Sequence, residues 1–350
     1  MIKVLVVDDS AVFRELLRTG LNKYDDIEVV ATARDPFEAR DMLLHYRPNV
    51  MICDIEMPKM NGLTFIKKLL PQYPIPTIVI SSLDSGAFDA MEAGAVDFVA
   101  KASINKRDLQ NQFVEEVAEK VKIAKKSKVV IGKKNSQVKE NDDKLKNKVK
   151  EVNKISEKKY DLSKTEVIAI GASTGGTEAI ATVVKGLPTN LPGIVIVQHI
   201  PPMFSAMFAE RLNKCTGFSV KEAVSGDEIK PGTILIAPGD KHLTVKRKGK
   251  KLVAVCEEGE KVSGHCPSVD VLFKSVAKTV GDKAVGVILT GMGADGAKGL
   301  LEMRNNGART IGQNKESSIV YGMPKEAYDM GAVQKQGGLD KISKMIVDML

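Results

Sequence analysis

Three short stretches of the sequence carry side chains that together could perform acyl transfer. IGASTGG places Ser173 among small residues, QHIPPMFS carries His199, and TGMGADG carries Asp295. A serine nucleophile needs a base to take its proton, and the base needs a carboxylate to orient it. The first stretch matches G-x-S-x-G, the pattern of a nucleophile elbow, although the same glycines could also form a phosphate loop at a helix N-terminus.

The base must come from four histidines: His45, His199, His242 and His265. His199 directly follows the apolar run GIVIVQ and Ser173 directly follows VIAIGA. If both runs are parallel strands, their carboxyl ends meet at one edge of a sheet, so His199 is the predicted base. His242 and His265, which lie in loop or hairpin contexts, are the alternatives. A strand-end histidine that bonds only to the backbone is a further interpretation of His199.

The stretch GMGADG also matches G-x-G-x-x-G, the spacing of a dinucleotide-binding loop. An aspartate inside that loop would repel a pyrophosphate. An NAD site also requires an acidic residue about 20 residues further on, and Glu316 falls beyond the predicted end of the next strand. We therefore predict a catalytic loop that directs Asp295 at His199. An NAD-dependent enzyme is the alternative.

A second group of chemically active side chains follows predicted strands nearer the N-terminus. These residues are Asp8 and Asp9 after the first strand, Asp54 after the third, Ser81 after the fourth and Lys101 after the fifth. Clustered carboxylates repel one another unless a cation joins them, and Mg²⁺ suits oxygen ligands that also meet a phosphoryl group. A lysine and a hydroxyl nearby would stabilise the added phosphate charge. Helix capping is the competing interpretation, and it explains Asp9 alone.

Alternating strand and helix patterns predict the element types that position both groups. In the N-terminal part the strands KVLVVD, EVVATA, NVMICD, TIVISS and VDFVA alternate with amphipathic stretches at 11–22, 35–46 and 106–125. Continuous apolar strands between helices predict a parallel sheet covered on both faces, here a five-stranded (βα)5 domain.

The same alternation restarts after residue 163. The predicted strands are EVIAIGAS, GIVIVQH, GTILIAPG, AVGVILTG and ARTIGQ, with helices at 202–213, 268–280 and 297–306. The stretch 241–256 carries KRKGKK at its centre and predicts a hairpin. We therefore predict a second, doubly wound α/β domain with a small antiparallel hairpin.

Between these domains the composition changes. The stretch 123–163 holds 13 Lys, no Arg and 6 acidic residues, which accounts for most of the net charge of +8. Tyr160 is its one aromatic residue, so stacking on bases has little support and we expect no nucleic-acid partner. We predict a flexible linker, which divides the chain into domains at 1–122 and 164–350.

The remaining composition fits an ordinary globular protein. The chain has 350 residues, of which 43% are hydrophobic and 27% charged. No apolar run reaches the length of a membrane helix, and the acidic pair after the first strand interrupts any signal peptide, so we expect a cytoplasmic protein. The four cysteines form no C-x-x-C pair, and reduced thiols are expected.

Motifs in both domains carry a resemblance to a known family. Residues 1–122 resemble a two-component receiver domain. Residues 164–350 resemble the catalytic domain of the chemotaxis protein-glutamate methylesterases (the CheB family). The second resemblance rests on the chain order Ser, His, Asp and on the stretches IGASTGG, QHIPPMFS, APGDKHL, HCPSVDVLF, TGMGADGAKGL and YGMPKEAYDMGAV.

The receiver resemblance implies a role for each residue of the acidic group. Asp54 matches the phospho-accepting aspartate, and Asp8 and Asp9 match the acidic pair that binds Mg²⁺ together with it. Ser81, Phe98 and Lys101 match the switch hydroxyl, the switch aromatic and the lysine that contacts the phosphoryl group.

The methylesterase resemblance implies a Ser-His-Asp enzyme. Ser173 matches the nucleophile, His199 the base and Asp295 the orienting acid. Backbone N–H groups at Met292 and Thr174 are expected to hold the oxyanion. The implied reaction is demethylation of glutamate methyl esters, and deamidation of specific glutamines, on chemoreceptors after phosphorylation by a chemotaxis histidine kinase, with no cofactor for the ester hydrolysis.

Ala102, Cys266 and the stretch GQN at 312–314 depart from the family patterns, and the family commonly has AQD in place of GQN. Ala102 stands where receivers usually have proline after the lysine, so a trans peptide bond is expected there. Cys266 stands where the family more usually has arginine. Phosphorylation-gated binding without catalysis is the alternative function for such a chain.

Overall fold

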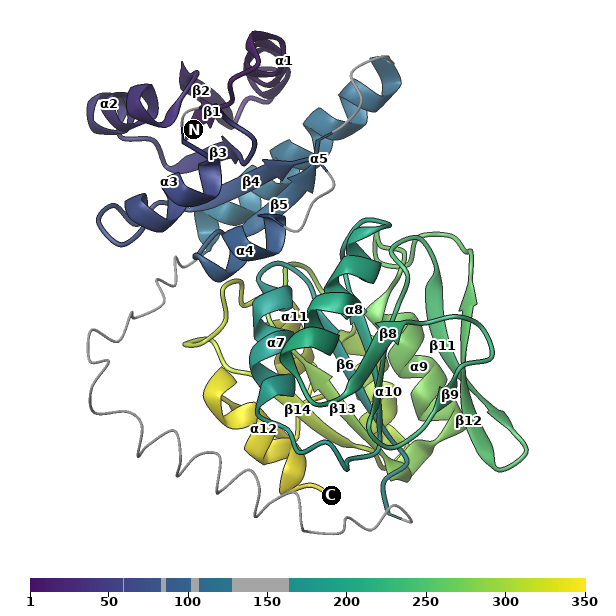
Figure 1. Cartoon of the computed structure of the whole chain (residues 1–350). Helices are drawn as coiled ribbons and strands as arrows, with labels where there is room; N and C mark the ends of the chain where they lie inside the picture. The colour runs from purple at the N-terminus through teal and green to yellow at the C-terminus, as the bar shows by residue number, and fades with distance from the viewer. Residues whose placement is uncertain (59, 83–85, 102–106, 128–163) are drawn as a thin grey trace. The chain divides into compact units, whose positions relative to one another are not determined.

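The protein is described by a computed structural model that covers residues 1–58, 60–82, 86–101, 107–127 and 164–350. It forms two compact units, one before and one after the predicted linker, and each has its own sheet (Figure 1). Residue 102, where a trans peptide bond is expected, and the stretch 128–163 lie outside the described residues.

The N-terminal unit is built on a five-stranded parallel sheet in the order β2-β1-β3-β4-β5. Its strands are β1 (Ile2–Val7), β2 (Ile27–Ala33), β3 (Val50–Asp54), β4 (Thr77–Ser81) and β5 (Asp97–Ala100). All residues of the central strands β3 and β4 are buried. Burial of one large aliphatic side chain stabilises a fold by about 1.5–3 kcal/mol, so these runs fix the centre of the sheet. The predicted (βα)5 fold is confirmed.

Five helices cover this sheet: α1 (Ala11–Leu21), α2 (Pro36–Tyr46), α3 (Gly62–Leu69), α4 (Gly86–Glu92) and α5 (Arg107–Lys126). Side-chain caps start several of them. The Ser10 hydroxyl accepts the Phe13 N–H at α1, and the Asp35 carboxylate accepts the N–H groups of Phe37 and Glu38 at α2. Such caps satisfy donors that have no partner inside the helix.

Helix α5 extends past the predicted end of the first domain. It runs to Lys126, and Ala124 is fully buried, so the predicted boundary between residues 122 and 123 falls inside this helix. The apolar spacing of α5 thus continues into lysine-rich sequence. The predicted domain bounds and the linker stay predictions.

The C-terminal unit contains a seven-stranded parallel sheet in the order β15-β14-β13-β6-β7-β10-β8. The strands are β6 (Val167–Ala172), β7 (Gly193–Gln198), β8 (Ser219–Glu222), β10 (Thr233–Ile236), β13 (Ala284–Ile288), β14 (Arg309–Gln313) and β15 (Lys335–Gly337). The strands β8 and β15 were not predicted. They are short, polar strands at the two edges, so neither has the apolar run that marks a central strand.

Helices cover both faces of this sheet, which confirms the predicted doubly wound fold (Figure 1). They are α7 (Gly176–Lys185), α8 (Phe204–Cys215), α9 (Val269–Thr279), α10 (Ala297–Asn305), α11 (Met323–Asp329), α12 (Leu339–Val347) and the short 3₁₀ helix η1 (Gly281–Lys283). Helix α7 contacts α8 and α12, whereas α9 and α10 pack on each other.

The predicted hairpin is part of a separate antiparallel sheet. Strands β11 (His242–Lys248) and β12 (Lys251–Glu257) pair in register, and β9 (Glu228–Ile229) adds a short third strand. Strand β11 packs against α9, and its first residue, His242, lies within hydrogen-bond distance of Ser268 at the N-terminus of that helix. Within the described residues, none of the helices is long and apolar enough to cross a membrane.

Candidate functional site

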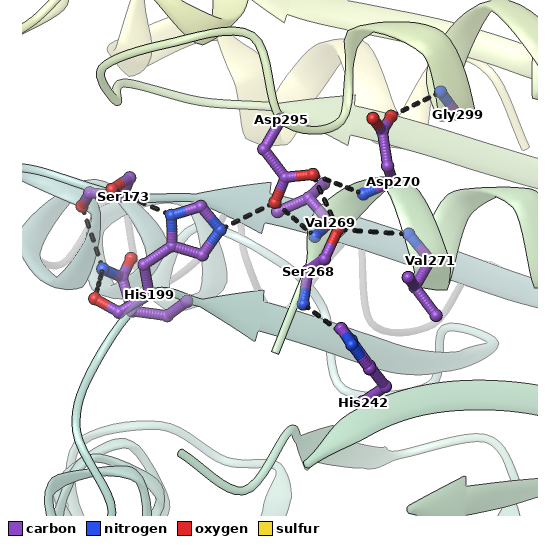
Figure 2. Close-up of polar contacts among 10 residues, drawn as sticks. Ser173, His199, His242, Ser268, Val269, Asp270, Val271, Asp295 and Gly299 are labelled. Atoms are coloured by element: carbon purple, nitrogen blue, oxygen red, sulfur yellow. Dashed lines mark hydrogen bonds and ion pairs between the residues drawn. The ribbon is translucent and has the colours of Figure 1, made fainter. Parts of the chain in front are cut away.

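Ser173, His199 and Asp295 form one hydrogen-bonded line at the carboxyl edge of the large sheet (Figure 2). Ser173 directly follows β6, His199 directly follows β7, and Asp295 lies in the loop after β13. These are neighbouring strands, with β6 in the middle. The Ser173 Oγ lies 3.1 Å from His199 Nδ1, and the His199 Nε2 lies 2.8 Å from Asp295 Oδ2.

The two bonds of His199 determine which of its nitrogens can act as a base. An ionised Asp295 only accepts hydrogen bonds, so the ring proton of neutral His199 belongs on Nε2. The lone pair of Nδ1 then faces the Ser173 hydroxyl. The ring thus has the orientation opposite to that of the chymotrypsin triad, where Nε2 faces the serine.

Asp295 is held by the start of helix α9. Its Oδ1 accepts the Ser268 hydroxyl at 2.7 Å and the Asp270 N–H at 3.0 Å, and its Oδ2 accepts the Val269 N–H at 2.7 Å. Burial acts to raise the pKa of Asp295, but hydrogen bonds from His199, Ser268 and Asp270 outweigh it and hold the pKa below its usual value. Asp295, which is 1% exposed, therefore stays ionised beside the imidazole.

Two side chains at the start of α9 fix where this helix begins and how it is held against α10. Ser268 is the N-cap residue, whose hydroxyl also accepts the Val271 N–H at 3.4 Å. The Asp270 carboxylate accepts the Gly299 N–H at 2.7 Å and so ties α9 to α10 (Figure 2). Burial raises the pKa of Asp270.

The loop after β6, which carries Ser173, lies close to the loop after β13, which carries the GMGADG stretch. The Ser173 N–H donates to Thr290 O at 2.9 Å, and the Thr290 hydroxyl donates to Thr174 O at 3.0 Å. A Cβ at Gly291 would lie 2.7 Å from Ser173 Cβ and would also overlap Met323 Sδ. The glycine at 291 therefore serves close packing against the serine.

We expect Gly291→Ala to lower the rate constant by about 10- to 100-fold, because the new methyl group must displace Ser173 from His199. Steady-state hydrolysis, with thermal unfolding as a folding check, measures this. Gly338→Ala is the matched control, since that glycine has φ −66° and its nearest neighbour is the movable Asp340 carboxylate. Equal losses in both variants would contradict the packing argument.

The alternative bases have other partners. The His265 ring stacks on His199, with centroids 3.7 Å apart and an interplanar angle of 18°. His242 accepts the Ser268 N–H (Figure 2). Its other ring nitrogen bonds to Glu260 O. His45 packs edge-on against Tyr46 in the N-terminal unit. The hydrogen bond to Ser173 comes from His199, which supports His199 as the base.

The predicted oxyanion residues lie in the loops on either side of the nucleophile. Thr174 follows Ser173 and is buried, and Met292 follows Gly291 and is partly exposed. Within the described residues the Met292 N–H has no hydrogen-bond acceptor. Gln198 Nε2 donates to Ser173 O at 2.9 Å and to His199 O at 3.3 Å, which joins the serine and histidine loops.

The acidic group of the N-terminal unit converges around Lys101. Its ammonium lies 2.6 Å from Asp54 Oδ2 and 3.0 Å from Asp8 Oδ2. Asp8 and Asp54 are each 1% exposed, whereas Asp9 is exposed. One carboxylate oxygen from each aspartate lies within 4.8 Å of the other two, a spacing that one metal ion can bridge.

The charge state of this group fits a divalent cation. Burial raises the pKa of Asp54 and of Asp8, although Lys101 opposes the shift in both. Asp8 Oδ2 is buried, and in the described part of the chain the Lys101 ammonium lies 3.0 Å from it. A buried carboxylate oxygen that is held by a single cationic side chain is a suitable ligand for Mg²⁺.

The predicted switch residues flank this group. Ser81 ends β4, the strand beside Asp54, and its Oγ donates to Ser82 O at 3.0 Å. Phe98 is buried and packs edge-on against Phe88 of α4, with centroids 5.7 Å apart. The side chain of Phe98 thus points into the space between β5 and α4.

Sequence reasoning missed the residues that hold Asp295. Ser268, Val269 and Asp270 lie in the motif HCPSVDVLF, but residue type and spacing predict no role for them. A serine before an apolar-periodic run with an acidic residue in the first turn is an N-cap signal. The start of the helix could therefore be predicted, but its contact with Asp295 could not.

The thiol of Cys266 donates to Asp240 O at 3.3 Å. All four cysteines are free, and burial raises the pKa of Cys256 to about 11.

Family models match both units of the chain. The CheB methylesterase model covers residues 168–346, and the response regulator receiver domain model covers residues 4–113. The first of these matches includes Ser173, His199 and Asp295, and the second includes the Lys101 group.

Relatives and a solved structure agree with these matches. A protein-glutamate methylesterase/protein-glutamine glutaminase from Syntrophomonas wolfei is 49% identical, with 100% of this chain and 98% of the relative covered. A protein-glutamate methylesterase/protein-glutamine glutaminase from Salmonella typhimurium is 44% identical, with 99% of this chain and 96% of the relative covered. The CheB methylesterase catalytic domain of Thermotoga maritima superposes with a TM-score of 0.52 at 36% identity, covering 53% of this chain and 99% of that domain. A receiver unit and a catalytic unit in this order, similar over the full length to such relatives, show that the chain belongs to the CheB methylesterase family.

Proposed function

We propose that this protein hydrolyses methyl esters of glutamate side chains on chemoreceptors and deamidates specific receptor glutamines, and that phosphorylation of its receiver unit activates it. The hydrogen-bonded line from Ser173 through His199 to Asp295 is the observation that carries this proposal. Its order is nucleophile, base and acid, the order that acyl transfer requires.

The reaction begins when Ser173 Oγ attacks the ester carbonyl and His199 Nδ1 takes the hydroxyl proton. The imidazolium that forms is stabilised by the ionised carboxylate of Asp295. The tetrahedral oxyanion is held by the backbone N–H groups of Met292 and Thr174, and such a donor is typically worth about 3 kcal/mol in the transition state.

Collapse of this intermediate breaks the ester bond, and His199 returns its proton to the departing methoxide, which leaves as methanol. Water then attacks the acyl-enzyme with His199 as base, which releases glutamate and restores Ser173. A glutamine side chain follows the same route with ammonia as the leaving group. Both reactions are hydrolytic and need no cofactor.

In the receiver unit Asp54 is the proposed phosphoryl acceptor, with a histidine kinase as the donor. Mg²⁺ would be held by Asp8, Asp9 and Asp54 and would neutralise charge on the phosphoryl oxygens. Lys101 would bind the same oxygens, and Ser81 and Phe98 would respond to them.

Asp8→Asn tests the proposed magnesium site through stability. The folded-state pKa of Asp8 lies above its unfolded value because of burial, so ionised Asp8 weakens the fold at pH 7. This cost disappears as the pH falls through the folded pKa toward the unfolded value of about 3.9. We expect Asp8→Asn to raise the unfolding midpoint at pH 7 without Mg²⁺, and to bring no advantage below about pH 4.

Added Mg²⁺ should raise the midpoint of the wild type more than that of Asp8→Asn, because binding stabilises only the state that has the site. Calorimetric melts with and without Mg²⁺ measure this. Asp89→Asn on the exposed face of α4 is the control and should keep the wild-type response. An equal magnesium response in the wild type and Asp8→Asn would remove Asp8 from the site.

Two measurements test the esterase. A serine-directed phosphonate should label Ser173. Mass spectrometry of receptor peptides incubated with the protein should show a loss of about 14 Da for each demethylation and a gain of about 1 Da for each deamidation. Unchanged peptide masses in the presence of phosphodonor and Mg²⁺ would count against the proposed reaction.

A further inference from the structure

His242 is not one of the three reacting residues, but it is hydrogen-bonded to the segment 268–270, which holds Asp295. It is the first residue of β11 and is 8% exposed. Its Nε2 lies 2.9 Å from Glu260 O, and its Nδ1 lies 3.2 Å from Ser268 N. A carbonyl oxygen only accepts and a backbone N–H only donates, so these partners place the proton on Nε2 and a lone pair on Nδ1.

Ser268 connects His242 to the triad. It is the residue before the first turn of α9, and its hydroxyl donates to Asp295 Oδ1 at 2.7 Å. The next two N–H groups, of Val269 and Asp270, bind the same carboxylate. Three consecutive residues thus place Asp295, and His242 holds the backbone of the first of them (Figure 2).

Without an acceptor at His242 Nδ1, the buried Ser268 N–H would lose its hydrogen bond. An unsatisfied buried donor is costly, and the segment would shift to find another acceptor. A shift of Ser268 moves Asp295, because the hydroxyl and the carboxylate are directly bonded. Asp295 in turn sets the tautomer and the orientation of His199.

We propose that His242 is a positioning residue for ester hydrolysis: its unprotonated Nδ1 fixes Ser268, and through Ser268 it fixes Asp295 against His199. This inference rests on the proposed function. It assigns His242 no contact with substrate and no proton transfer. The hydrogen bond from Nε2 to Glu260 O orients the ring so that Nδ1 faces Ser268.

Two variants of similar size separate this role from simple packing. In His242→Asn the amide oxygen can occupy the place of Nδ1 and accept the Ser268 N–H, while the bond to Glu260 is lost. In His242→Gln the amide nitrogen can reach the place of Nε2 and donate to Glu260 O, while the acceptor for Ser268 is lost. Each variant therefore keeps one of the two bonds.

We expect His242→Asn to keep kcat within about threefold of the wild type and His242→Gln to lower kcat by about 10- to 100-fold, with KM little changed in both. The full chain is used, activated by phosphodonor and Mg²⁺, with receptor peptide as substrate and circular dichroism as a folding check. Equal kcat values for the two folded variants, the reverse order, or a loss confined to KM would overturn the proposal.

If the glutamine variant fails to fold, His242→Asn decides alone. Folded His242→Asn with kcat more than about tenfold below the wild type would overturn the role of the Nδ1 acceptor, and near-wild-type kcat would support it. Failure of the proposed function is recognised separately, because the wild type would then leave the peptide unchanged in the same assay.

Discussion

Asp295→Asn is expected to lower the rate constant for ester hydrolysis by about 10³- to 10⁴-fold while the protein stays folded. The asparagine oxygen can still accept from Ser268 and Asp270, which leaves its NH₂ group facing His199 Nε2 and the Val269 N–H, and the latter loses its acceptor. The contact with His199 favours the tautomer with the proton on Nδ1, and Nδ1 then cannot take the Ser173 proton. Charge stabilisation of the imidazolium is lost as well. Single-turnover demethylation measures the effect.

Asp270→Asn is the matched control for this change. Asp270 is the neighbouring buried carboxylate, and its side chain bonds to the Gly299 N–H and not to the His199 ring. We expect its rate constant to stay within about tenfold of the wild type. Near-wild-type turnover by folded Asp295→Asn would refute the triad, and so would an equally large loss in Asp270→Asn.

Asp54→Asn is expected to abolish activation by phosphodonor. The carboxylate oxygens of Asp54 face Lys101 at 2.6 Å and the Glu56 N–H at 3.2 Å, and an amide in their place cannot form the acyl phosphate. The rate with phosphodonor and Mg²⁺ should fall to that of the untreated chain. Glu56→Gln, an exposed neighbour, should keep the activation. Activation that persists in Asp54→Asn would place the acceptor elsewhere.

A fragment that contains only the catalytic unit tests whether the receiver inhibits that unit or is merely tethered to it. If the unphosphorylated receiver inhibits the catalytic unit, a 164–350 fragment should be more active than the untreated full chain. A tenfold difference needs a shift of only about 1.4 kcal/mol between inhibited and active forms. Equal rates for the fragment and the untreated chain would contradict inhibition.

The parts of the fold that were predicted from the sequence are those whose signal is local. Central strands such as β6 and β7 are fully buried, so each reads as a continuous apolar run that ends at the active residue. The edge strand β8 buries little more than Val220 and shows no such run. Its strand state comes from pairing with β10, which sequence patterning does not display.

The site shows the same division. Ser173 and His199 were predicted from residue type and strand-end position, and Asp295 from its place in the loop after a strand. Their chemical roles stay predictions. The bond from Ser268 to Asp295 joins residues from different loops, and the stacking of His265 on His199 joins two more. Such contacts depend on where the loops meet, and neither propensity nor spacing carries that information.

The position of the triad on three neighbouring strands also affects how the protein regains activity during refolding. Its two hydrogen bonds join residues 26 and 96 positions apart in the chain, and β13 must pair with β6 before the second can form. Closing such long loops is slow, whereas a helix such as α7 forms from contacts within one turn. During refolding, the circular dichroism signal of the helices should therefore recover before the hydrolytic activity does. The recovery of enzyme activity therefore reports when the central sheet has assembled. It does not report the earlier collapse of the chain.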